Sequence, residues 1–330
     1  MRNKLLLLTI TVACVLLTLG TGSVQAADDS FPKVVSLGTG SVGGGYNMVG
    51  VGAAKVWNKE LGLKAKVAPG SAVSNHRRFA EGRLDIVVAP SSFSKAAWGG
   101  LKALGFPQPI QNFRVLGYIF PDIFHFVALK KKGLKNVIDL KGKRVGCGSK
   151  ASTYDKIIGK RLEANGIKYF GDNPDFKKTF SNYNDLARLL GDGNLDATLI
   201  GVSGIAPFPA LQKLMEEKEL VALEWSKAAL DYKDPIFGVG MIKKEILPYL
   251  KKDHYSIVGG IASFIVRQDF SDEFAYALIK SIHQNLPKIA ETNPYYKYPN
   301  RYPEILTLDA GVPYHPGAIK YWKEAGLWNR

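Results

Sequence analysis

The residues with the clearest chemical potential are the glycines and hydroxyl residues of the segment 38–46, which reads Gly-Thr-Gly-Ser-Val-Gly-Gly-Gly-Tyr. The segment follows the short apolar run 34–37 and precedes a helical pattern over 47–59. Such a turn leaves backbone N–H groups at a helix start, where they bind anions. The glycines let a ligand approach the backbone, and Thr39 and Ser41 add neutral donors. The segment therefore predicts an anion site.

The glycine spacing also matches the dinucleotide-binding pattern Gly-x-Gly-x-x-Gly, at Gly38, Gly40 and Gly43. That site needs an acidic residue about 20 positions later, at the end of the second strand, to bind the ribose. The second predicted strand ends at 68–71 without an acid, and Glu60 lies at a helix end. A phosphate P-loop needs Gly-Lys-Ser/Thr, whereas Gly43 is followed by two more glycines. Both nucleotide interpretations fail, and we predict no cofactor.

Hydroxyl residues also follow the other predicted strands. They occupy the loops Gly70-Ser71, with Ser74-Asn75 one helical turn later, then Pro90-Ser91-Ser92, and Ser149-Lys150-Ala151-Ser152-Thr153-Tyr154. Ligands of open parallel sheets sit beyond the carboxyl ends of the strands, so we expect these loops to converge on the segment 38–46. Each serine alone is more simply a helix cap, but four such loops together favour a binding site.

Patterns that indicate catalysis are sparse. The chain has no Gly-x-Ser-x-Gly elbow, no His-Glu-x-x-His motif and no histidines at metal-ligand spacing. His76 and His125 are candidates for lining a cleft, and His315 fits a turn before the last helix. Cys147 is better explained as a buried thiol on a strand than as a nucleophile. We therefore predict that the protein is not an enzyme and has no metal site.

The N-terminus has the pattern of a secretory signal peptide. A charged start, Met-Arg-Asn-Lys, precedes an apolar run over 5–19 and small residues that end at Ala26 and Ala27. The run is shorter than the roughly 18 residues that a membrane span needs, so cleavage after Ala26 is favoured over an uncleaved anchor. A lipoprotein attached at Cys14 is a weaker alternative. We expect an exported protein.

Composition narrows the class further. The chain of 330 residues has a formal charge of +15, and loss of Arg2 and Lys4 with the signal peptide leaves +13. The excess fits either a solvated basic surface or the attraction of acidic small molecules to a positive cleft. Nucleic acid is disfavoured, because no aromatic and basic RNA-binding motif is present. Cys147 would be the only cysteine left after cleavage, so we expect no intrachain disulfide. The length of the mature chain predicts two domains, and we expect a monomer.

Strand and helix patterns alternate along the chain, which predicts parallel α/β sheets. Strands are expected at 63–68, 84–89, 113–119, 124–129, 142–147, 196–200, 220–223 and 255–267, and helices at 73–81, 90–98, 153–165, 183–190, 207–218, 272–285 and 316–325. Gly82 and Gly166 fit the positions just after helix ends, and Ser271 fits an N-cap. The segment 293–303, rich in Pro and Tyr, is expected to be a loop.

Six blocks in this order resemble the TAXI family, the solute-binding proteins of one class of TRAP transporters. They are Gly38-Thr39-Gly40 with Gly44-Gly45-Tyr46, Gly70 to Asn75, Gly82-Arg83-Leu84-Asp85-Ile86, Leu140 to Val145, Gly193-Asn194-Leu195-Asp196-Ala197, and Tyr314-His315-Pro316-Gly317-Ala318 with the following Tyr321 to Gly326. The resemblance implies a two-lobed periplasmic-binding-protein fold, each lobe a mainly parallel sheet flanked by helices. It places lobe I at 27–120 and 256–330, lobe II at 121–255, and hinge strands near 117–127 and 256–266.

The resemblance also implies a function in the periplasm. The lobes would close on a small organic anion, such as glutamate, a 2-oxoacid or a dicarboxylate, and deliver it to a TRAP membrane permease driven by an ion gradient. Matched to the motifs, the ligand-binding residues would be Thr39, Gly40, Ser41, Tyr46 and Asn75, with Ser152 and Thr153 from the second lobe. The loop pattern adds Ser92, Ser149 and Tyr154 to these candidates.

Two loops depart from the family pattern. Pro90-Ser91-Ser92 stands where the family often has Gln-Ser-Asp, and the loop 148–154 differs from the usual Gly-Ser-Pro-Gly-Ser-Gly-Thr by a lysine and a tyrosine, which would select a different or more acidic ligand. Carboxylate partners among Arg77, Arg78, Arg114 and Lys150 are not resolved by sequence. Two alternatives remain open: a receptor of an ABC importer, as in the sulfonate and thiamine-precursor receptors, and an enzyme on the same scaffold.

Overall fold

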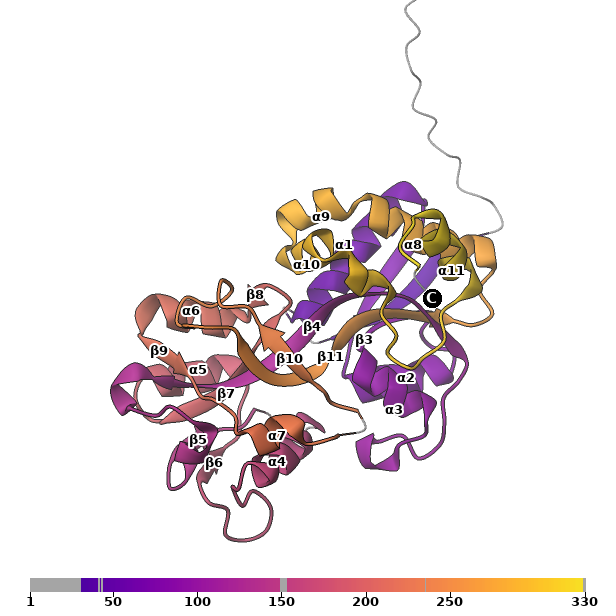
Figure 1. Ribbon diagram of the computed structural model, residues 1–330. Helices are drawn as coiled ribbons and strands as arrows, with labels where there is room; N and C mark the ends of the chain where they lie inside the picture. The colour runs from indigo at the N-terminus through magenta and orange to yellow at the C-terminus, as the bar shows by residue number, and fades with distance from the viewer. Residues whose placement is uncertain (1–30, 41, 43, 149–152, 235, 329–330) are drawn as a thin grey trace, which may run out of the picture. The chain divides into compact units, whose positions relative to one another are not determined.

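A single sheet runs through residues 32–330 of the computed structural model, in the strand order β2-β1-β3-β11-β4-β7-β5-β6. The structure describes residues 31–40, 42, 44–148, 153–234 and 236–328, without the side chains at 153, 154, 156 and 157. Two long strands, β4 (Phe113–Leu129) and β11 (His254–Arg267), lie side by side and run between two groups of elements (Figure 1). The predicted α/β class is confirmed.

The first half of the sheet carries the N-terminal elements and the C-terminal helices. Here β1 pairs in parallel with β2 and with β3, and β3 pairs antiparallel with β11. The elements are β1 (Val34–Thr39), α1 (Gly45–Glu60), β2 (Lys64–Pro69), α2 (Ala72–Ala80), β3 (Ile86–Pro90), α3 (Ser91–Trp98), η1 (Lys102–Leu104), α8 (Asp272–Gln284), α9 (Leu286–Thr292), η4 (Pro294–Tyr296), α10 (Lys297–Arg301), η5 (Pro303–Thr307) and α11 (Pro316–Glu324). The chain therefore returns to this half after β11, and the indole of Trp57 on α1 donates to the carbonyl of Leu278 on α8.

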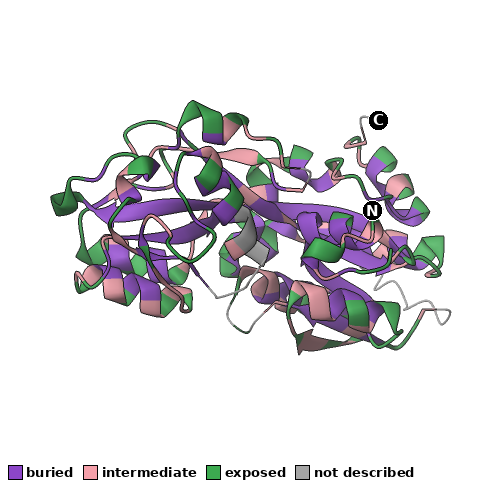
Figure 2. Cartoon of the chain, turned by 90° about the horizontal axis from the view of Figure 1, so that it is seen from below, coloured by how far each residue is buried: buried purple, intermediate pink, exposed green. Residues whose placement is uncertain are grey.

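The second half is built from the middle of the chain. Here β5 pairs in parallel with β6 and β7, while β4 pairs antiparallel with β7 and β9. The elements are η2 (Lys130–Lys132), η3 (Val137–Leu140), β5 (Arg144–Gly146), α4 (Thr153–Ala164), β6 (Lys177–Thr179), α5 (Tyr183–Gly191), β7 (Ala197–Ser203), β8 (Ala206–Pro207), α6 (Pro209–Glu217), β9 (Leu220–Ala222), α7 (Lys227–Asp231) and β10 (Val239–Ile242). Two buried apolar clusters cover this half of the sheet, and Figure 2 shows buried strands beneath helices with exposed outer faces.

Two predictions about elements are wrong. The strands predicted at 113–119 and 124–129 are one strand, β4, although Pro121 lacks a donor. Its pairing with β11 shifts register around this point, and the Pro121 carbonyl accepts from the N–H of Gly204, so the missing donor breaks no continuous ladder. The loop predicted at 293–303 contains η4 and α10, because the Asn293 side chain caps the turn and Pro294 begins it.

The two long strands both pass from one half of the sheet to the other, and their pairing has a register break at this passage, which we call the crossing. Asp122 of β4 lies opposite Gly260 of β11, and the register shifts on both sides of this pair, between Val258 and Gly260 and between Ile261 and Ser263. Gly260 has a φ of 152°, and a Cβ there would lie 2.7 Å from the Ser92 hydroxyl. The lobe boundaries predicted at 120/121 and 255/256 fall within these two strands, near this crossing.

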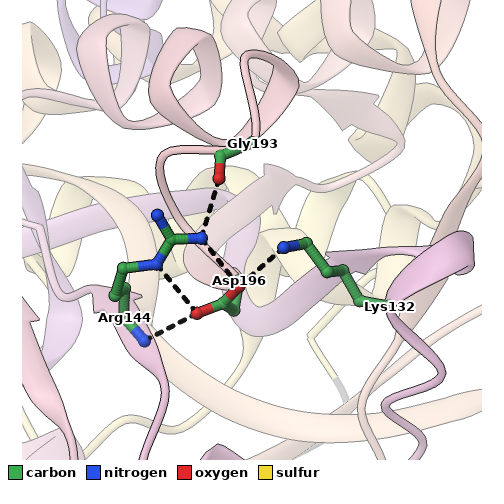
Figure 3. A network of polar contacts seen from close by, with 4 residues as sticks. All are labelled: Lys132, Arg144, Gly193 and Asp196. Atoms are coloured by element: carbon green, nitrogen blue, oxygen red, sulfur yellow. Dashed lines mark hydrogen bonds and ion pairs between the residues drawn. The ribbon is translucent and has the colours of Figure 1, made fainter.

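A Gly-x-Leu-Asp turn fixes the strands of each half in the same way. In the second half, the backbone N–H of Arg144 donates to Asp196 at 3.0 Å, and the Arg144 guanidinium and Lys132 Nζ bind the same carboxylate (Figure 3). In the first half, the N–H of Ser36 donates to Asp85 at 2.8 Å. Each aspartate thereby aligns the strand that leads to a candidate binding loop, and the same contact occurs in both halves.

Candidate functional site

The loop between β1 and α1 lies at the carboxyl end of the parallel strands, as predicted. Helix α1 begins at Gly45, and its N-cap residue, Gly44, has no side chain with which to cap the helix. Gly40 packs against the same helix start, because a Cβ at Gly40 would lie only 3.0 Å from the Cβ of Tyr46. Gly40 and Tyr46 are thus brought together at a helix N-terminus with an anion-binding geometry.

Thr39 and Asn75 are also brought together, but inside the molecule. The Thr39 hydroxyl accepts from Nδ2 of Asn47 at 2.9 Å, and its carbonyl accepts from Nδ2 of Asn75 at 2.8 Å. All three side chains are buried. The glycine at position 70 makes room for this arrangement, since a Cβ there would lie 2.3 Å from Oδ1 of Asn75. These residues tie the end of β1 to α1 and α2.

The described serines of the predicted first-half loops have protein partners. Ser71 and Ser74 form a capping box at the start of α2. In α3, the Ser92 hydroxyl donates to the Gly259 carbonyl at 2.6 Å, and the Ser91 hydroxyl accepts from the N–H of Ile261 at 3.0 Å. Ser92 therefore anchors the first turn of α3 to β11 at the crossing of the long strands.

The second-half loop can be placed only in part. Ser149, Ser152 and the first-half residue Ser41 lie outside the described residues, as does Lys150. Thr153 and Tyr154 begin α4 directly after the loop that follows β5. Their role in ligand binding stays a prediction.

A buried carboxylate that the sequence analysis missed stands at the crossing of the long strands. Asp122 is 3% exposed and pairs with Ser203, the last residue of β7. The hydroxyls of Ser203 and Tyr46 both donate hydrogen bonds to it. Since Tyr46 belongs to α1, this carboxylate is bound from both halves of the sheet. Its sequence signal is weak: it is the one acid in the apolar stretch 113–129 and directly follows Pro121.

Aromatic residues lie together beside Asp122, and two of them, Tyr46 and Tyr295, interact with its carboxyl group. The Phe120 ring lies 5.8 Å from the Tyr46 ring and 5.5 Å from the Tyr295 ring, measured between centroids. A Cβ on Gly45 would lie 3.1 to 3.3 Å from Tyr295, the Ser203 hydroxyl and Phe120, so the start of α1 packs directly on this group. We call Tyr46, Phe120, Asp122, Ser203 and Tyr295 the carboxylate site.

Burial dominates the electrostatics of this site. Desolvation raises the pKa of Asp122 to about 6, and the hydrogen bonds from Ser203 and Tyr46 oppose that rise only in part. The pKa values of Tyr183 and Tyr295 are also raised, mainly by burial and then by the Asp122 charge. No Lys, Arg or His of the described chain contributes to the pKa of Asp122. The carboxylate thus has hydrogen-bond donors but no cationic partner there.

The other reactive side chains are arranged for packing. Burial raises the pKa of the Cys147 thiol to about 12. Burial also lowers the pKa of His76 to about 4, and the two ring nitrogens of His76 contact the Ala72 carbonyl and the Ser94 hydroxyl. His315 caps α11, as expected of a turn residue. Across the described ranges, no three His, Cys, Asp or Glu residues are grouped to hold a metal ion.

The arginines considered as carboxylate partners point elsewhere. Arg77 donates to the Gly105 carbonyl, and Arg114 donates to the Phe113 carbonyl and stacks on Trp98. Arg78 lies 3.5 Å from Oδ1 of Asn75 and is the one of the three that adjoins the network behind the loop. Among the described helices, none is long and apolar enough to cross a membrane.

Comparisons with known proteins identify the family and the fold. A model of the NMT1-like family matches residues 37–326. The structure of PhnD1 from Prochlorococcus marinus (MIT 9301) in complex with methylphosphonate is similar, with a TM-score of 0.50 and 14% identity, covering 90% of this chain and 100% of that one. The periplasmic aliphatic sulphonate binding protein SsuA from Escherichia coli has a TM-score of 0.48 and 13% identity, covering 91% and 95% of the two chains. The predicted fold of periplasmic solute-binding proteins is thereby confirmed.

Proposed function

Because the chain belongs to the NMT1-like family, we propose that it is an extracytoplasmic receptor that binds a small organic anion and passes it to a membrane transporter. One observation carries the proposal. The buried Thr39–Asn47–Asn75 network ties the end of β1, at the carboxyl end of parallel strands, to α1 and α2, and the sixteen-residue helix α1 begins without a side chain at its N-cap. This is the geometry in which backbone N–H groups and the helix dipole stabilise an anion.

The position of this loop supports a site formed by both halves of the sheet. The start of α1 packs against Ser203 of β7 and against Phe120 of β4. Ligands of α/β sheets bind beyond the carboxyl ends of the strands. We infer that lobes bounded at 27–120 with 256–330, and at 121–255, close on the solute by bending β4 and β11 near Asp122 and Gly260.

The transporter has two candidates. The family match favours an ABC importer of the sulfonate or thiamine-precursor type. The six sequence blocks that resemble the TAXI family favour a TRAP permease instead. Affinity capture from detergent-solubilised membranes of the source cells, followed by mass spectrometry, separates them: an ATP-binding subunit among the partners supports the first, and a large permease without one supports the second.

The ligand class is tested by direct binding. The protein is expressed as the full chain, purified after export, and stripped of bound solute by unfolding and refolding. It is then titrated by calorimetry with carboxylates, phosphonates and sulphonates, and with their neutral amides as matched controls. Anions are expected to bind and the amides are not. Binding of neutral sugars or nucleotides alone would overturn the proposal. N-terminal sequencing of the exported form tests cleavage after Ala26 and location in the periplasm.

A further inference from the structure

We propose that Asp122 is a cation subsite within the solute site, and that the solute is an anion which also carries an ammonium group. The inference rests on the proposed function, because it places the subsite beside the anion-binding start of α1. It adds a second recognition element of opposite charge, and so a narrower class of solute than small anions in general.

The hydrogen bonding of Asp122 leaves acceptor positions that a ligand could fill. An ionised carboxylate offers about four acceptor positions. Two are filled, by the hydroxyls of Ser203 and Tyr46. Both donors are neutral, and a buried charge is ordinarily paired with an opposite charge. An ammonium group has three donors and a full positive charge, so it fits the two open positions and supplies the missing charge.

The rings around Asp122 favour the same occupant. Tyr46, Phe120 and Tyr295 form a contiguous set, with centroid distances of 5.8 and 5.5 Å between neighbours. Aromatic faces attract cations through their quadrupoles, and the attraction is larger where water is excluded. A free anion is poorly suited to this place, because both the carboxylate and the ring faces repel it.

The anion and cation elements are close enough for one small molecule. Gly45, at the first position of α1, packs on Ser203 and Phe120 of the carboxylate site, and Tyr46, the next residue, donates to Asp122. A solute whose anionic group caps α1 therefore has its neighbouring atoms near Asp122. Tyr46 is partly buried as a whole, and its hydroxyl, which interacts with Asp122, is fully buried.

Matched pairs of solutes test the proposal. The probes are 2-aminoethylphosphonate against ethylphosphonate, taurine against ethanesulfonate, and glutamate against glutarate, each titrated by calorimetry at pH 7.5 into the exported, solute-free protein. For the pair that binds, we expect the amino member to bind at least tenfold more tightly, which corresponds to about 1.4 kcal/mol. In Asp122→Asn, the amino member should lose at least tenfold in affinity, while the des-amino member changes by less than threefold.

The outcomes separate this inference from the proposed function. If both members of a pair bind wild type within threefold of each other, the cation subsite is refuted and the anion receptor stands. If no member of any pair binds but another anion of the panel does, the cation subsite is refuted and the anion receptor stands; if no anion of the panel binds, both are refuted. If the amino preference survives in Asp122→Asn, the ammonium group is bound elsewhere. The wild-type comparison needs no variant, and a crystal structure with the amino member must show its nitrogen within hydrogen-bond distance of Asp122.

Discussion

Replacement of Asp122 by asparagine should make the solute-free protein more stable at neutral pH. Burial raises the pKa of this carboxyl from 3.8 to about 6. A shift of about two pKa units corresponds to about 3 kcal/mol that the folded state loses when the group ionises. The amide of asparagine has nearly the same shape, can accept a hydroxyl through Oδ1 and donate to one through Nδ2, and carries no charge. We therefore expect the free energy of unfolding to rise by up to about 3 kcal/mol at pH 7.5.

The pH dependence of this stability difference follows from the linkage between proton binding and folding. Between pH 4 and 6 the folded state holds a proton on Asp122 that the unfolded state has released, so wild-type stability falls as pH rises through this window. The loss of stability caused by ionised Asp122 is fully present above pH 6 and absent below pH 4. The groups that face the carboxylate, Tyr46, Tyr183 and Tyr295, are neutral phenols throughout this range. The stability difference between variant and wild type should therefore shrink toward zero by pH 4.

Urea unfolding followed by tryptophan fluorescence measures this difference at several pH values, since the chain has five tryptophans. Asp172→Asn, at an exposed position, is the matched control and should change stability by less than about 0.5 kcal/mol. The reasoning is refuted if Asp122→Asn is less stable than wild type at pH 7.5, or if the difference between them does not depend on pH. Either result would mean that the native fold stabilises the ionised carboxylate.

Three further variants test the surroundings. Gly45→Ala places a methyl group 3.1 to 3.3 Å from atoms of the carboxylate site, and calorimetry should show about tenfold weaker solute binding. The control is Gly238→Ala, whose added methyl group meets no atom within 4 Å and should leave solute binding unchanged. Ser92→Ala leaves the buried Gly259 carbonyl without its donor, and thermal unfolding should show a loss of about 1–3 kcal/mol. Asp196→Asn should lower the melting temperature at pH 7, and by less at pH 3. Hydrogen bonding, chiefly with the Arg side chain on β5, holds the Asp196 pKa well below its usual value, so this stability is fully present above pH 4 and declines as pH falls toward the lowered pKa. An equal loss at both pH values would contradict that account.

Local features of this fold could be predicted from sequence because their causes are local. Ser271 caps α8, and Gly82 and Gly166 adopt φ values of 71° and 81° just after α2 and α4. Each depends on residues within one helical turn. The continuity of β4 could not be predicted in this way, because the effect of Pro121 depends on its partner strand, more than a hundred residues later. The register break that makes the proline harmless is visible only in the paired strands.

The candidate site also combines features that depend on nearby residues with features that depend on distant ones. Sequence alone places the glycine loop before α1 and identifies Thr39 and Asn75 as important. It cannot tell a residue that contacts a ligand from one that shapes the loop, since that depends on whether the side chain faces the protein. Asp122 was missed for a related reason: its partners, Tyr46 and Ser203, are 76 and 81 residues away in the chain. An acid in an apolar strand has meaning only when the groups around it are known.

The cost of burying Asp122 and its role as a subsite are two consequences of one arrangement. A carboxylate that is already neutralised by a lysine or arginine would add stability but would gain nothing from a ligand. With two hydroxyl donors and no Lys, Arg or His beside it among the described residues, Asp122 destabilises the solute-free protein, and a cationic ligand stabilises it. The free energy lost in the empty state is recovered on binding, so the same group makes the solute-free form less stable and the complex more selective. Because its donors come from α1 on one half of the sheet and β7 on the other, that recovered free energy favours the state in which the two halves meet.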